Sequence, residues 1–79
     1  MHWYFELLKK TQNGYVYRYS TDCDALDGLI EYDERTDESE VIRPSEVDKD
    51  SERRQIKALR SFANVIFEGF PVKRHVCCG

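Results

Sequence analysis

The dipeptide Asn13-Gly14, which separates two aromatic-rich runs, constrains the fold of this 79-residue sequence more than any other feature. Both residue types tolerate the positive φ angles of a two-residue hairpin turn, so the pair is a strong hairpin signal between extended runs. The sequence therefore predicts a first strand over residues 2–10 and a turn centred on Asn13-Gly14. A second strand is expected to begin at Tyr15.

A two-residue loop at this position fixes which residues of the hairpin oppose each other. Gln12 would then lie opposite Tyr15, and Leu8 opposite Tyr19. Side chains alternate between the two faces of a strand, so each face can be predicted from this register. One face is expected to carry Tyr4, Leu8, Tyr15, Tyr17 and Tyr19. The other face is expected to carry Trp3, Phe5, Leu7 and Val16.

The rest of the chain predicts two further strands, one helix and a closing strand. Strands are expected over residues 28–32 and 39–43, with Pro44 ending the second because proline has no N–H for a sheet ladder. A helix is expected over roughly residues 51–68, followed by a strand over residues 72–78. The helix has a predicted apolar stripe of Ile56, Leu59, Phe62, Ala63, Ile66 and Phe67, with Arg54 and Val65 pointing away.

This order of elements predicts a single α+β domain over residues 1–79. It is a small antiparallel sheet in the order ββββαβ, with one helix packed on one face. We expect the helix to cover the sheet face that carries Trp3, Phe5, Leu7 and Val16. The opposite face, which includes the tyrosines, would then stay open.

Composition and charge narrow the classes of function. A chain that is 41% hydrophobic and 13% aromatic is too apolar for intrinsic disorder. Its formal net charge of -3 opposes phosphate binding, which dominates affinity for duplex nucleic acid. There is no apolar run of membrane-spanning length and no leader-like N-terminus. The three cysteines, an odd number, do not form a disulfide framework. We expect a complete cytoplasmic chain with reduced thiols and no membrane contact.

The metal and catalytic motifs in the sequence are incomplete, so we expect no metal, no cofactor and no enzyme activity. Residues 22–28 resemble a calcium loop, but Leu26 occupies the position of the third oxygen ligand. Zinc through His75 and Cys77 remains an alternative, although the sequence shows no second ligand pair at a typical spacing. Neither histidine lies in a recognisable nucleophile motif.

The tyrosines Tyr15, Tyr17 and Tyr19, with Tyr4 beside them, form the candidate binding face. Tyrosine suits a protein interface because it buries a large area and keeps a polar tip. The prediction is therefore a non-enzymatic interaction module that forms a homodimer through this face or through an edge strand. Two alternatives remain. The tyrosines could form the core face under the helix, or Tyr15, Tyr17 and Tyr19 could stack the bases of single-stranded nucleic acid.

Three segments resemble a group of small uncharacterised bacterial proteins. They are NGYVYRY at residues 13–19, DGLIEYD at residues 27–33 and FEGFPVKR at residues 67–74. The motifs consist of turns and strand starts. The resemblance therefore implies a bacterial cytoplasmic origin and no particular activity, cofactor or functional residue.

Overall fold

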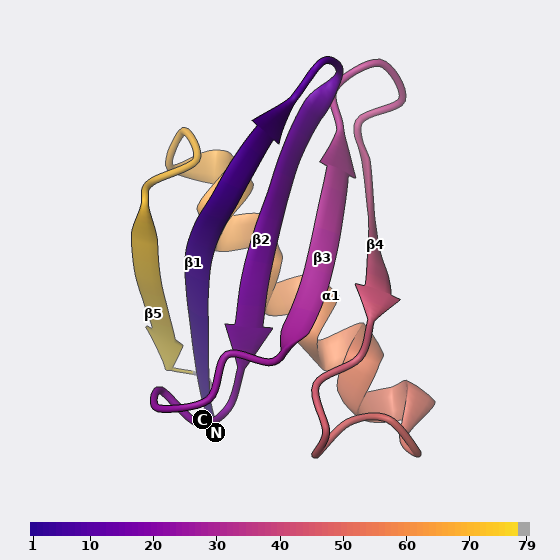
Figure 1. The fold of residues 1–79 in the computed structure, drawn as a ribbon, viewed down its shortest axis with the longest axis vertical. Helices are drawn as coiled ribbons and strands as arrows, with labels where there is room; N and C mark the ends of the chain where they lie inside the picture. The colour runs from indigo at the N-terminus through magenta and orange to yellow at the C-terminus, as the bar shows by residue number, and fades with distance from the viewer. Residues whose placement is uncertain (78–79) are drawn as a thin grey trace.

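The computed structural model describes residues 1–77 and shows one antiparallel sheet with a helix against one face (Figure 1). This confirms the predicted α+β class and the ββββαβ order. The elements are β1 (His2–Thr11), β2 (Gly14–Ser20), β3 (Gly28–Asp33), β4 (Glu38–Arg43), α1 (Glu52–Phe67) and β5 (Lys73–Cys77). The predicted end of the last strand at Cys78 lies outside the described residues.

The five strands are arranged in the order β4-β3-β2-β1-β5. The first four strands form a meander, and α1 then runs diagonally behind the sheet (Figure 1). This crossing brings the chain from the β4 edge to the opposite edge, where β5 pairs antiparallel with β1. No helix within residues 1–77 is long and apolar enough to cross a lipid bilayer.

The β1–β2 turn lies one residue earlier than predicted. Thr11 pairs with Gly14, so Gln12 and Asn13 are the two loop residues and Gly14 already belongs to β2. Within residues 1–77, positive φ angles occur only at Asp37, Gly69 and Phe70. Gly14 has no positive φ angle, so conformational freedom does not explain the glycine. Close packing does, because a Cβ there would lie 1.8 Å from the carbonyl oxygen of Tyr32.

The predicted faces of the hairpin are wrong because the register of β1 shifts at Leu8. Leu7 pairs with Tyr17 and Lys9 with Val16, so Leu8 is an extra residue in β1. A bulge of this kind reverses the alternation of side chains on one side of it. Residues 3, 5 and 7 therefore share the face of Tyr15, Tyr17 and Tyr19. Val16 lies on the opposite face with Tyr4, contrary to our prediction.

The core lies between this aromatic face and α1. Phe62 is at its centre, with edge-on ring contacts to Phe5 at 5.6 Å and to Tyr17 at 5.3 Å between centroids. The buried hydrophobic cluster consists of Trp3, Phe5, Tyr17, Tyr19, Ile30, Tyr32, Ala58, Phe62, Val65 and Val76. The helix part of the prediction was partly wrong, because Val65 is fully buried whereas Ile56, Ala63 and Phe67 face solvent. Apolar residues lie on so much of the α1 surface that their spacing fits two different choices of the side that faces the core.

Candidate functional site

The predicted tyrosine binding face does not exist as one exposed surface. Tyr17 and Tyr19 are fully buried beneath α1, and Tyr15 is partly buried against Phe70, with ring centroids 4.0 Å apart. Tyr4 lies on the other side of the sheet, because the bulge at Leu8 separates the two sets. A nucleic-acid base cannot stack on the rings of Tyr17 and Tyr19 while the helix covers them. These two tyrosines belong to the core, which was one of the alternatives that the sequence allowed.

The hydroxyl groups of the two buried tyrosines bond to the segments that flank α1. Tyr17 donates to the carbonyl oxygen of Pro71 at 2.6 Å, and the hydroxyl of Tyr19 accepts from the backbone N–H of Ser45 at 3.1 Å. Burial raises the pKa of each phenol to about 12, because a phenolate would lose its hydration there. These bonds anchor both ends of the helical crossover to β2.

A partly buried ion pair lies beside Tyr19. The carboxylate of Asp48 is fully buried and accepts a 2.8 Å hydrogen bond from Nε of Arg54. The guanidinium carbon of Arg54 lies 5.9 Å from the centre of the Trp3 ring. Arg54, predicted to point away from the core, therefore links the start of α1 to the sheet. We assign this cluster a structural role.

Solvent-exposed residues on the far side of α1 form the first candidate interface. We call Arg53, Ile56, Lys57, Arg60, Ala63 and Phe67 the outer α1 face. Phe67 is 92% exposed and Ile56 is 46% exposed. A shallow depression of about 460 Å³ lies at the N-terminal half of this face, lined by Glu52, Arg53, Ile56, Lys57 and Arg60. No ion pair within residues 1–77 involves its three cations.

A pair of histidines forms the second candidate site, at the β1–β5 edge of the sheet. Nδ1 of His2 lies 2.8 Å from Nε2 of His75, and the ring of Tyr4 stacks on His75 with centroids 4.6 Å apart. Cys77, which is exposed, pairs with His2 in the strand register. A cavity of about 340 Å³ adjoins His75 and Tyr4, with Cys23 and Leu26 of the β2–β3 loop also in its lining.

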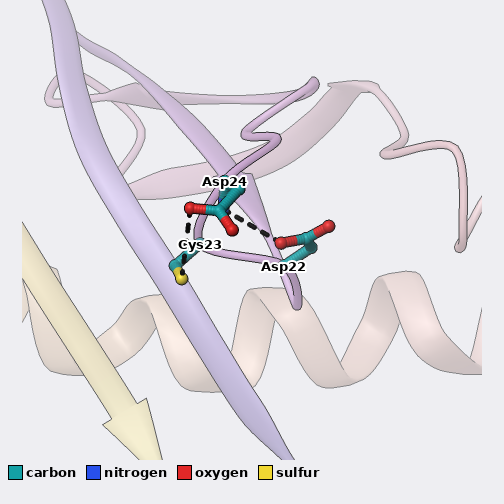
Figure 2. A group of neighbouring side chains, drawn as sticks. All are labelled: Asp22, Cys23 and Asp24. Atoms are coloured by element: carbon teal, nitrogen blue, oxygen red, sulfur yellow. Dashed lines mark hydrogen bonds between the residues drawn. The ribbon is translucent and has the colours of Figure 1, made fainter.

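The acidic β2–β3 loop holds a third group of possible metal ligands, Asp22, Cys23 and Asp24 (Figure 2). All three side chains are exposed, and their contacts are local. The N–H of Asp24 donates to a carboxylate oxygen of Asp22 at 3.0 Å, and the Cys23 thiol lies 3.9 Å from an oxygen of Asp24. These hydrogen bonds explain the arrangement as a polar turn. Strands precede and follow the loop, so the helices of a helix–loop–helix calcium site are missing at this position.

Comparison with known proteins found no matching protein family, no similar curated protein and no similar solved structure. The geometry of the described residues is therefore the basis for a functional assignment.

Two features of the candidate sites were not predicted from the sequence. The exposed position of Phe67 was hidden by its place in an apolar stripe, and the proximity of His2 to His75 was hidden by their separation along the chain.

Proposed function

We propose that this protein is a non-enzymatic interaction module that forms a homodimer through the outer α1 face. The observation that carries the proposal is the 92% exposure of Phe67 at the end of a helix whose opposite side is packed into the core. Phe67 continues an exposed apolar line with Ile56 and Ala63, and a contiguous apolar surface with polar residues around it is typical of an interaction site.

The apolar residues of this face are aligned on one side of the helix. Ile56, Ala63 and Phe67 are separated by seven and four residues, which are two turns and one turn of an α-helix. The span from Ile56 to Phe67 is about 16 Å at 1.5 Å per residue. Ala63 between them allows close approach of a second helix. The face therefore has the length and shape for packing against another helix.

The outer α1 face is complementary to a second copy of itself in antiparallel orientation. The depression lies in the N-terminal half around Ile56, whereas Phe67 projects from the C-terminal half. An antiparallel pair of helices would place each Phe67 over the partner's depression, and one two-fold axis generates both contacts. The same arrangement brings a ring close to the partner's Arg53 and Arg60, where a cation–π contact is favourable.

The distribution of charge also favours the antiparallel pair. Arg53 and Lys57 lie in the N-terminal half of α1 and Arg60 lies just past its midpoint, so a parallel pair would bring the two sets together. Antiparallel packing moves Arg53 and Lys57 of the two copies to opposite ends of the interface, leaves the two Arg60 residues near its centre, and opposes the two helix dipoles. Pairing through the β4 edge is less favourable, because it would bring the exposed Glu38 and Glu40 of two copies close together.

We also propose a cytoplasmic location in a bacterial cell. Its support is the resemblance in residues 13–19, 27–33 and 67–74, together with the thiols of Cys23 and Cys77. Both thiols are free and exposed, as is common in a reducing compartment.

Sedimentation velocity over a range of concentrations tests the dimer. We expect the native chain to shift from monomer to dimer as concentration rises and Phe67→Lys to remain monomeric. Leu8→Lys is the matched control, because Leu8 is also an exposed apolar residue, at 47%, but belongs to β1 and not to the outer α1 face. A native chain that stays monomeric at every concentration would contradict the proposal, as would a Phe67→Lys dimer as strong as the native one.

A comparison of Phe67→Lys with Phe67→Glu tests the antiparallel register. A lysine would meet the three cations around the partner's depression, whereas a glutamate could pair with them. We therefore expect Phe67→Glu to dimerise more strongly than Phe67→Lys, with the difference decreasing at high salt. Equal loss of the dimer in both variants would exclude this register, because Phe67 would then not lie against the partner's basic residues.

A further inference from the structure

The two imidazole rings at the β1–β5 edge have the geometry of an incomplete metal site. Their nitrogens, Nδ1 of His2 and Nε2 of His75, are 2.8 Å apart and share one proton in a hydrogen bond. A dication that replaces this proton would use both nitrogen lone pairs. With metal–nitrogen bonds of about 2.0–2.1 Å in a tetrahedral site, the two nitrogens would lie about 3.3 Å apart. A small rotation of exposed side chains supplies this change of roughly half an ångström.

Strand register places the backbone of Cys77 beside the two histidines. His75 and Cys77 are two residues apart in β5, so their side chains leave the same face of the sheet. Cys77 is also the direct cross-strand partner of His2. Within residues 1–77 the Cys77 sulfur does not lie within 4.8 Å of both imidazoles. Opposed residues in an antiparallel pair have Cβ atoms about 4.5–5.5 Å apart, so a rotation of the exposed Cys77 side chain would bring the thiol to a metal held by both rings.

The surroundings of the pair fix its orientation and leave it accessible. Tyr4 pairs with His75 and stacks on its ring with an interplanar angle of 9°. The two nearest cations of β5 are already engaged, since Lys73 lies 3.6 Å from Glu6 and Arg74 donates to Glu68 at 2.8 Å. Their repulsion of a bound dication is thereby reduced.

From this geometry we infer that His2, His75 and Cys77 form a binding site for a zinc-type dication. Two imidazoles and one thiolate are a borderline-soft donor set, which suits Zn²⁺ better than Ca²⁺ or Mg²⁺. Water would complete a tetrahedron at the exposed edge. The site would join the first strand to the last one, so metal binding would stabilise the pairing of β5 with β1.

Titration of the full chain with Zn²⁺, followed by calorimetry, tests the site. We expect one ion per chain and a higher melting temperature in its presence. His2→Ala and His75→Ala should each weaken binding by roughly tenfold or more. In parallel, titration with Co²⁺ should give a thiolate-to-metal absorption band that Cys77→Ser removes. Thermal unfolding without metal establishes that each variant is folded.

Two serine variants serve as controls. Cys23→Ser changes an exposed thiol in the acidic loop, and Cys78→Ser changes the residue next to the proposed ligand; both should bind Zn²⁺ like the native chain. Binding that survives His75→Ala but is lost in Cys23→Ser would overturn the proposal in favour of the β2–β3 loop. Absence of saturable Zn²⁺ binding to the native chain would overturn it outright. Phe67→Lys should keep the site, which separates this inference from the proposed dimer.

Discussion

The hydroxyl of Tyr17 donates a 2.6 Å hydrogen bond to the carbonyl oxygen of Pro71. This contact joins the centre of the sheet to the segment that leads from α1 into β5. It also explains why a tyrosine, rather than a phenylalanine, occupies a fully buried position of β2. A buried hydroxyl is stable only when it has a partner, and the Pro71 carbonyl supplies one.

Replacement of this hydroxyl should therefore weaken the fold. We expect Tyr17→Phe to lower the free energy of unfolding by about 1–3 kcal/mol, because the mutation leaves the Pro71 carbonyl without its partner. Urea denaturation followed by circular dichroism measures the change. Tyr15→Phe is the matched control, since no hydrogen bond of the Tyr15 hydroxyl is found within residues 1–77. Equal effects of the two substitutions would show that the Pro71 bond contributes nothing.

The contact between Gly28 and Tyr19 leads to a second prediction. The two residues are cross-strand partners, and a Cβ at Gly28 would lie 2.3 Å from the Tyr19 ring and 2.8 Å from the Ser45 nitrogen. Gly28→Ala should lower the free energy of unfolding by about 1–3 kcal/mol, since the buried Tyr19 ring cannot move without disturbing the core. Thermal unfolding provides the measurement.

Gly69→Ala gives a comparison with a different physical cause. Gly69 has a φ of 81°, but a Cβ there would meet nothing within 4 Å. Gly69→Ala should lower the free energy of unfolding by about 1 kcal/mol, because alanine tolerates this backbone conformation less well than glycine. If Gly28→Ala proved milder than Gly69→Ala, close packing at Tyr19 could not be the reason for glycine at residue 28.

The sequence predicted the elements and their order well, because alternation, turn residues and a cap act locally. The prediction failed where one residue decides which side of the sheet or of the helix the other side chains face. Leu8 is apolar like Leu7 before it, so nothing in the pattern marked it as the extra residue that moves Trp3 and Phe5 to the tyrosine face. In the same way, α1 is apolar on more than one side, and only its packing against Phe5 and Tyr17 shows that Val65 faces inward and Phe67 outward. The His2–His75 contact depends on the tertiary fold and is invisible to any local pattern.

A third prediction concerns alkaline pH. The pKa of Tyr17 and of Tyr19 is about 12 in the folded chain, against about 10 in an unfolded one, chiefly because burial disfavours the phenolate. The contribution of these two phenols to the free energy of unfolding is fully present below pH 10. It decreases as pH rises from about 10 to about 12, because the unfolded chain releases protons that the folded chain retains.

Denaturation at a series of pH values should show this decrease, and Tyr19→Phe should make it shallower. Phenolate absorbance of the folded chain provides an independent check, since the component that titrates near pH 12 should diminish in the same variant. A pH dependence unaffected by Tyr19→Phe would rule out Tyr19 as a source.

The fourth prediction concerns the ion pair between Asp48 and Arg54. Asp48 is fully buried, whereas the Arg54 side chain keeps 31% of its exposure. Removal of the arginine charge should leave a buried carboxylate without its counter-ion, so we expect Arg54→Met to cost about 3 kcal/mol. Asp48→Asn removes the charge that needs a partner, so Arg54→Met should cost much less in that background. A double-mutant cycle by urea denaturation measures this coupling. Additive effects would show that the two charges do not depend on each other, and Arg54 would then act only through its packing against Trp3.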